Sequence, residues 1–267
     1  GPIFTLKDFD ANSTDHNATL KAIGASLGKS TAELTQADLA KVEKLDLFGA
    51  GITDISPVAA LIGLKRLNIF GNKIADLTAL TGLTSLEVLY AIENKIADLS
   101  PLAGLTKLRV LHLGQNYIAD LSPLAGLTAM LSLDLERNRV GDIASLANLA
   151  DLNWLALGLN QVSNISPLEG TYNLRHLYLE HNRLSHETDL SALSQLRLLK
   201  TLSIRSNRID DLSSLEGLDK MLWLELDNNQ VYDLSPLAGM KGLKKLYMEN
   251  NKVRILHPLV ELTNLEI

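Results

Sequence analysis

The sequence of 267 residues contains no cysteine, so it can form neither a disulfide framework nor a cysteine-based metal site. It has no basic surplus: 25 lysines and arginines face 31 acidic residues, a net charge of −6 that argues against a nucleic-acid-binding surface. No uncharged apolar run approaches the ~18 residues that a membrane span requires. We therefore expect a protein that neither binds nucleic acid nor enters a membrane, from the cytosol or from the surface of a bacterium that does without disulfides.

Aromatic residues are also few, twelve in the whole chain, whereas leucine recurs with a fixed period. The phrase ADLSPLAGLT occurs at residues 97–106 and again at 119–128, a shift of 22 residues. Aligned on that period, the chain reads L-x-x-L-x-L-x-x-N-x-I-x-D-L-S-P-L-x-x-L-T-x. Such a period is the signature of a repeat protein. The repeats begin at Val42, Leu64, Leu86, Leu108, Met130, Leu152, Leu174, Leu199, Met221 and Leu243.

Each part of the period has a physical reason. The L-x-L core predicts a short strand whose side chains alternate inward and outward. One repeat cannot bury its own leucines, but stacked repeats form a continuous core. The asparagine, present in nine of the ten repeats, is expected to turn the chain and to satisfy backbone groups that the turn leaves inside. The pattern predicts a parallel sheet that lines one side of a solenoid.

The Ser-Pro pairs, for example Ser100-Pro101, predict how the chain returns between strands. We expect the serine to be an N-cap and the proline the first residue of a short helix, of the 3₁₀ type because little room is left. The step from Leu174 to Leu199 is 25 residues instead of 22, and we expect the three extra residues to form a local bulge between Leu184 and Leu190.

The N-terminal segment differs from the repeats. Leu20, Ile23 and Leu27 recur at helical spacing, and Thr35 is suited to cap a second helix with Asp38 in its first turn. These helices would cover the open edge of the first repeat, which could otherwise pair with another chain. The sequence thus predicts a helical cap over residues 1–41, ten repeats over 42–264, and the start of a truncated eleventh strand at 265–267.

The repeat phrase N-x-I-x-D-L-S-P-L-A-x-L-T resembles that of the bacterial leucine-rich repeat proteins of 22-residue period, in particular the internalins of Listeria. The order of the cap, a helix ending in L-G-K and then T-Q-x-D-L before the first strand, is similar as well. The resemblance implies an α/β solenoid: a leucine-rich repeat horseshoe with a concave parallel β-sheet, convex 3₁₀ or loop returns and an N-terminal α-helical cap. Internalins continue into an immunoglobulin-like module that is not seen here. We therefore expect a fragment, or a partner that covers the edge at an uncapped C-terminus.

Side-chain alternation predicts which residues lie on the concave face. Three outward positions in each of ten repeats make thirty positions, about a ninth of the chain, yet they hold seven of its twelve aromatic residues. Aromatic residues suit strands, but Trp and Tyr are also the common anchors of protein interfaces. We therefore predict a protein-binding surface made of Phe48, Phe70, Tyr90, Ile92, His112, Asp134, Glu136, Trp154, Tyr178, Glu180, Trp223, Glu225, Asp227, Tyr247 and Glu249.

This surface has two zones. An apolar zone around Phe48, Phe70 and Ile92 precedes a zone in which aromatic residues such as Trp154 stand among acidic ones. That composition favours a partner with basic and apolar groups, and ten strands span ~45–50 Å, which suits a protein or long peptide. Gly114 and Gly158 are open to two interpretations: they let a ligand approach the backbone, or they are ordinary variation.

Catalytic and metal sites are poorly supported. Ser132, Asp134 and His112 share the predicted face, but an open sheet offers neither a pocket nor strained oxyanion donors. The three histidines His176, His181 and His186 do not all lie on one side of the solenoid, so we expect a solvated surface there instead of a metal site. We expect no cofactor.

Protein recognition without catalysis, by a bacterial surface or secreted protein of the adhesin or virulence type, is the function that these observations favour. An intracellular scaffold similar to the leucine-rich regulatory subunit of protein phosphatase 1 is the cytoplasmic alternative. An engineered binding scaffold, suggested by near-identical repeats, is another, and an enzyme with the repeats as a substrate platform is the least favoured.

Overall fold

Each repeat contributes one strand of three residues to a parallel sheet in the computed structural model, which describes residues 4–266. The central leucine of strands β1 to β9 is at most 3% exposed. A buried leucine contributes roughly 1.5–3 kcal/mol, so the stacked leucines form the core of the fold. The strands, in sheet order, are β1 (Lys44–Asp46), β2 (Arg66–Asn68), β3 (Val88–Tyr90), β4 (Val110–His112), β5 (Ser132–Asp134), β6 (Trp154–Ala156), β7 (His176–Tyr178), β8 (Thr201–Ser203), β9 (Trp223–Glu225) and β10 (Lys245–Tyr247).

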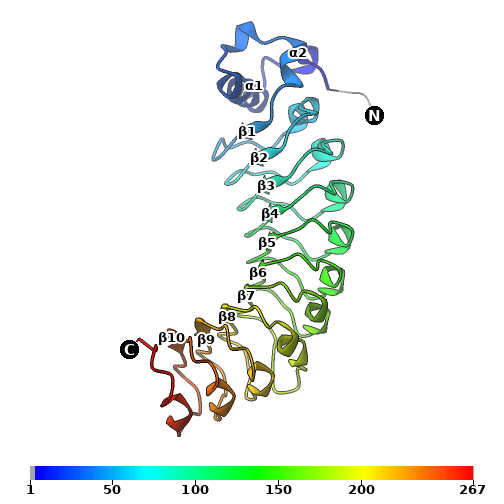
Figure 1. The fold of residues 1–267 in the computed structure, drawn as a ribbon. Helices are drawn as coiled ribbons and strands as arrows, with labels where there is room; N and C mark the ends of the chain where they lie inside the picture. Colours follow the sequence, from blue (N-terminus) through cyan, green and yellow to red (C-terminus); the bar gives the residue numbers. More distant parts are fainter. Residues whose placement is uncertain (1–3, 267) are drawn as a thin grey trace. The chain divides into compact units, whose positions relative to one another are not determined.

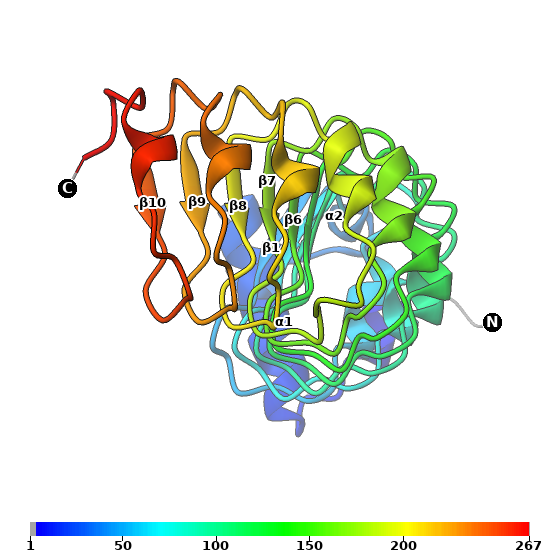
Figure 2. The ribbon, with the colours of Figure 1, turned by 90° about the horizontal axis from the view of Figure 1, so that it is seen from below.

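The chain divides into unit 1 (Gly1–Ser132) and unit 2 (Leu133–Ile267), and each is considered by itself. In both, the strands pair in parallel with one repeat aligned on the next, so Leu67 faces Leu89 in unit 1 and Leu155 faces Leu177 in unit 2. In each unit the strands form one layer and the short helices form another, as both Figure 1 and Figure 2 show. The predicted leucine-rich repeat solenoid is confirmed.

The returns between strands are 3₁₀ helices, as expected, but their capping differs from the prediction. The serine is the first helical residue, and its side chain does not cap: the N-cap of the helix Ser100–Leu102 is Leu99. The backbone N–H of Ser100 instead donates to Oδ1 of Asp98 at 2.8 Å. The aspartate two residues earlier therefore begins the turn, since its short side chain reaches the backbone two residues on. The returns are η3 (Ser56–Ala60), η4 (Thr78–Leu80), η5 (Ser100–Leu102), η6 (Ser122–Leu124), η7 (Ala144–Leu146), η8 (Ser166–Gly170), η9 (Ser191–Gln195), η10 (Ser213–Leu215), η11 (Ser235–Leu237) and η12 (His257–Leu259).

The asparagine side chains bind backbone groups of two successive repeats, which confirms their predicted role. Oδ1 of Asn160 accepts from the N–H of Val140 at 2.9 Å. Its Nδ2 donates to the carbonyls of Leu135 at 2.8 Å and Leu157 at 3.0 Å. Buried backbone N–H and carbonyl groups that make no hydrogen bond between strands obtain a partner in this way.

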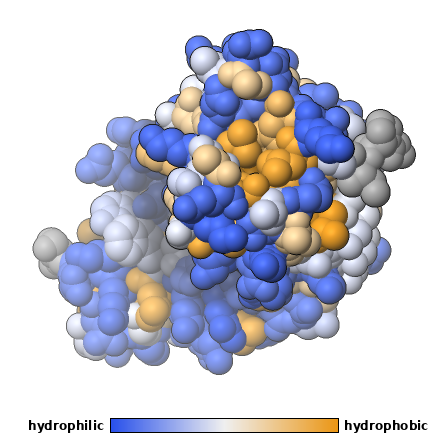
Figure 3. Space-filling model, turned by 90° about the horizontal axis from the view of Figure 1, so that it is seen from above, coloured by the Kyte–Doolittle hydropathy of each residue, from blue (hydrophilic) through white to orange (hydrophobic). Residues whose placement is uncertain are grey.

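The N-terminal segment forms the expected helices. Helix α1 (Thr14–Leu27) begins at Ser13, which caps it, and packs on the first strand. Helix α2 (Gln36–Leu39) begins with a capping box between Thr35 and Asp38, as predicted. Two further 3₁₀ turns, η1 (Leu6–Asp8) and η2 (Thr31–Glu33), precede the two helices. Seen from the end that carries these helices, the surface is mostly hydrophilic around one apolar patch (Figure 3).

Polar contacts attach the cap to the first repeat. Nε2 of His16 lies 3.0 Å from Oδ2 of Asp54, while its Nδ1 accepts from a backbone N–H. The carboxylate of Asp38 accepts from Lys29, and hydrogen bonds from the Thr35 backbone and from Lys29 lower the pKa of Asp38 to about 2. The His16–Asp54 contact joins the cap to the first repeat, whereas the bonds of Asp38 lie within the cap, and the boundary at residue 41 stays a prediction.

Two irregular places follow. The three extra residues of the long repeat form a turn in which Thr188 N–H donates to the Ser185 carbonyl at 3.0 Å, so the predicted local bulge is found. Near the end, the N–H of Glu266 donates to the Lys244 carbonyl at 2.9 Å, which continues the bonding between successive repeats. The expected eleventh strand stays a prediction, and its residue 267 lies outside the described residues.

No helix within residues 4–266 is long and apolar enough to cross a membrane.

Replacing Asn160 with alanine should destabilise the protein by about 3 kcal/mol, because the buried Val140 N–H and Leu135 carbonyl would lose their partners. Denaturant unfolding measures the change. The control is Asn164→Ala, which removes an exposed capping bond and should cost about 1 kcal/mol. Equal losses in the two variants would refute the structural role of the asparagine.

Candidate recognition surface

The outward positions of unit 1 carry two ring pairs. Phe48 and Phe70 lie with their ring centroids 5.3 Å apart, and Phe48 is 62% exposed. Tyr90 and His112 form the second pair, also at 5.3 Å, and Ile92 is half-buried. The five predicted residues of this unit thus lie on successive strands, or directly after them, as the alternation requires.

An outward position does not guarantee exposure. Val88 in unit 1 is only 5% exposed, and Ala156 and Ser203 in unit 2 are 4% and 1% exposed. All three are small or medium-sized residues, whose side chains do not reach far above the sheet. Val88 therefore contributes almost no surface, although side-chain alternation places it on the outward side.

The outward positions of unit 2 carry two more ring pairs. Trp154 and Tyr178 lie 5.6 Å apart with their planes inclined by 52°, and Trp223 and Tyr247 lie 5.6 Å apart with an inclination of 38°. In each pair the two rings come from adjacent strands. Trp223 is 39% and Tyr247 38% exposed, so amphipathic rings of this zone are open to a partner.

The acidic residues of unit 2 differ in how well they are compensated. Both carboxylate oxygens of Glu225 accept hydrogen bonds at 3.0 Å, one from the indole N–H of Trp223 and one from the hydroxyl of Ser203. Glu136 lies 3.5 Å from the Nε of Arg137. Asp134 accepts from the Glu136 backbone N–H at 2.9 Å, although burial raises its pKa. Asp227 is half-buried and accepts from the Glu249 N–H at 2.7 Å, and Glu249 is exposed.

Glu180 is the exception. Its Oε2 is buried and has no hydrogen-bond partner among residues 4–266. Burial, together with the negative charges of Glu136 and Glu225, raises the pKa of Glu180, while a hydrogen bond from its own backbone and the charge of Arg205 act in the opposite direction. An unsatisfied buried carboxylate is rare in proteins and calls for a physical explanation.

The position of Glu180 also settles the role of one glycine. A Cβ on Gly158 would lie 2.3 Å from Oε1 of Glu180, so the glutamate side chain folds into the space that the glycine leaves. The interpretation of Gly158 as a place where a ligand approaches the backbone is therefore wrong. A glycine one repeat before a glutamate, in the same outward column, is the sequence signal that could have revealed this arrangement.

The candidate catalytic pair in unit 1 is close but incomplete. Nε2 of His112 lies 3.0 Å from Oγ of Ser132, and burial lowers the pKa of His112. The backbone N–H of Ser132, however, donates to the Arg109 carbonyl at 3.0 Å, so it does not serve as an oxyanion donor. Among the described residues, no three acidic or histidine side chains gather as a metal site would need.

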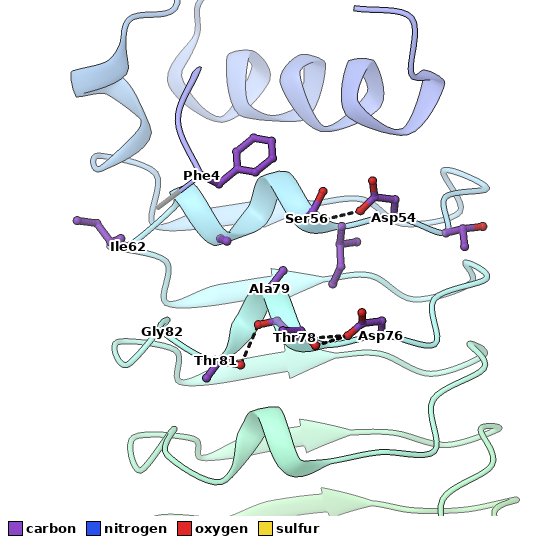
Figure 4. Close-up of a pocket in the computed structure, with 12 residues that line it drawn as sticks. Phe4, Asp54, Ser56, Ile62, Asp76, Thr78, Ala79, Thr81 and Gly82 are labelled. Atoms are coloured by element: carbon purple, nitrogen blue, oxygen red, sulfur yellow. Dashed lines mark hydrogen bonds between the residues drawn. The ribbon is translucent and has the colours of Figure 1, made fainter. Parts of the chain in front are cut away.

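Unit 1 also has two hollows that sequence reasoning missed. One, of about 610 Å³, lies where α1 meets the outer face of β1 and β2, beside Lys44, Arg66 and Tyr90. The other, of about 860 Å³, lies on the return side, between Phe4, Ile62 and the turns at Asp54 and Asp76 (Figure 4). These hollows depend on how the N-terminal segment packs on the first repeats, for which the repeat pattern gives no signal.

Comparison with known proteins identifies leucine-rich repeats in this chain. A family model described as Leucine Rich repeats (2 copies) matches residues 84–126 and 106–148, and a Leucine Rich Repeat model matches residues 173–196. Comparison with curated protein sequences gives no match.

Solved structures give closer likenesses. An internalin (inlF) from Listeria monocytogenes is 33% identical with a TM-score of 0.79, over 93% of this chain and 80% of that one. Internalin C2 from the same species is 32% identical with a TM-score of 0.60, over 94% and 91%. The ectodomain of the Arabidopsis thaliana receptor kinase GASSHO1/SCHENGEN3 is 21% identical with a TM-score of 0.74, over 86% and 29%, and this likeness shows the fold alone.

Glu180→Gln should stabilise the protein at pH 7.5, because it removes a desolvated negative charge. The carboxylate is unfavourable in the folded state only when ionised. Wild type should therefore lose stability as the pH rises from the ordinary glutamate value of 4.5 through the raised pKa of Glu180. Thermal unfolding at pH 4 and 7.5 measures this, and the two proteins should converge at pH 4. A variant less stable than wild type at pH 7.5 would contradict the assignment.

Proposed function

Because the chain belongs to the internalin family of leucine-rich repeat proteins, we propose that it recognises another protein through the outward face of its sheet. Ring pairs on the strands of unit 2 support this proposal most strongly, since Trp223 and Tyr247 are exposed and Trp154 and Tyr178 are half-buried. Trp and Tyr supply much contact area for little lost side-chain freedom and are enriched among binding hot spots. The fifteen predicted surface residues remain the proposed binding residues.

The ring pairs are held in place before any partner binds. The indole N–H of Trp223 donates to Glu225 at 3.0 Å, and the ring packs against Tyr247. Because this side chain is already ordered, binding would cost less conformational entropy than the ordering of a mobile ring. Leucines on the inner side carry the stability of the fold, so the rings are not needed for the core.

Family membership also suggests where the protein acts. We propose a secreted protein or one at the bacterial surface, with an adhesin or virulence role, since the resemblance to internalins covers both the cap and the repeats. The partner is a protein or a long peptide, and acidic residues between the rings favour basic groups on its surface.

The variant Trp154→Ala/Trp223→Ala/Tyr247→Ala should fold normally and lose its partner. Proteins crosslinked to the chain in lysates of candidate host cells are identified and compared with wild type. Each lost anchor is worth ~2 kcal/mol or more, so capture should fall by more than about tenfold.

The matched control is Tyr117→Ala/Tyr172→Ala/Tyr232→Ala, which removes three rings of 47%, 55% and 59% exposure that lie outside the strands. This control should capture the same proteins as wild type. Equal capture by both triple variants would refute recognition through the ring pairs.

A further inference from the structure

Glu180 lies in a conformation that the chain itself compensates only in part. Its side chain folds down onto Gly158, where a Cβ would overlap it at 2.3 Å, instead of extending into water. Its Oε2 is buried there with no partner among the described residues. A carboxylate loses much hydration free energy in such a place unless it is paired, so the arrangement is unfavourable in the isolated chain.

Glu225 provides an internal comparison two strands away. It lies on the same face of unit 2, and both of its oxygens accept hydrogen bonds, from Trp223 and Ser203. The fold can therefore satisfy a glutamate on this face with its own side chains. At Glu180 it leaves Oε2 without a partner, and the glycine beneath provides the space that the carboxylate occupies.

Two aromatic rings lie on the same outward face as this carboxylate, and the nearer one, Tyr178, feels its charge. Tyr178 precedes Glu180 by two residues, so both side chains lie on the outward side, and the ring of Trp154 packs against that of Tyr178 at 5.6 Å. Aromatic faces attract cations, and the attraction grows when water is excluded. A negative charge on the same face as a packed ring pair is the chemistry that recognises a guanidinium or ammonium group.

The surrounding charges strengthen that preference. Glu136 and Glu225 both act electrostatically on Glu180, and Arg205 is the cation that opposes them. The potential over Glu180 is therefore dominated by like charges, which a bound cation would relieve.

We propose that Trp154, Tyr178 and Glu180 form a receptor for one cationic side chain, an arginine or a lysine, of the bound protein. The proposal rests on the proposed function and deepens it by assigning the chemistry of the partner at this point. The cation lies against the two rings and pairs with Glu180, whose unmet charge is the source of the selectivity. Neutral partners of the same shape are rejected because they leave this carboxylate desolvated and unpaired.

The test uses small probes, so it does not depend on the unknown partner. The whole chain is labelled with 5-fluorotryptophan, which gives one ¹⁹F resonance for each of its two tryptophans, Trp154 and Trp223. It is titrated at constant ionic strength with N-acetylarginine amide or with N-acetylcitrulline amide, which has a similar shape and no charge. We expect arginine amide to shift the Trp154 resonance saturably and citrulline amide to leave it unchanged.

Glu180→Gln should weaken the arginine response at least about tenfold. Glu187→Gln removes the same charge from an exposed side chain away from the sheet and should change nothing. Lowering the pH should weaken binding as Glu180 becomes protonated. Four other ionisable groups face Glu180: Glu136, Glu225, Arg205 and the neighbouring Tyr178. The Glu187→Gln control keeps all four.

The absence of a saturable shift of the Trp154 resonance, an equal response to the two probes, or an unchanged response in Glu180→Gln would each overturn the cation receptor. These outcomes differ from a failure of the proposed function. If the ring variant loses its crosslinked partner while Glu180→Gln keeps it, the face is the binding surface and the cation receptor is wrong.

Discussion

The bonds that the asparagine side chains make to two repeats at once fix the register on which the rest of the structure depends. Asn94, for example, accepts from the N–H of Ile74 and donates to the carbonyl of Ile69, both in the preceding repeat, and also donates to Ala91 in its own. A repeat shifted by one residue would leave these buried groups unpaired. It would also turn every strand side chain to the other face. The outward position of Trp154 is therefore a consequence of polar groups on the inner side.

The sequence predicts the backbone plan well because that plan depends on contacts that recur at a fixed spacing. A leucine at each inner position and an asparagine at each turn predict the strand, its phase and its parallel neighbours without any knowledge of distant contacts. The same reasoning placed Trp154 and Tyr178 on one face, and their ring contact follows from that placement.

The details that the sequence missed all involve side chains of different sizes or a choice between local hydrogen-bond partners. Serine before proline looked like an N-cap, but Asp98 makes that bond because its carboxylate reaches the Ser100 N–H. Val88 lies at an outward position and is nevertheless buried. Gly158 looked like an opening until the Glu180 side chain was placed in it. Periodicity describes each column of residues, whereas these outcomes depend on which particular side chains meet between columns.

This architecture separates stability from recognition by physical means. The inner leucines and asparagines hold each repeat through contacts that outward residues do not share, so a change on the outer face leaves the core packing intact. An outward residue can therefore remain in an electrostatically unfavourable state without unfolding the chain, as Glu180 does beside the well-compensated Glu225. A partner that supplied a cation would pair with a carboxylate that has no partner in the isolated chain. Selectivity on such a face is therefore expected where a buried charge is left unpaired. The aromatic rings contribute contact area, and the unpaired carboxylate of Glu180 determines that the bound group is a cation.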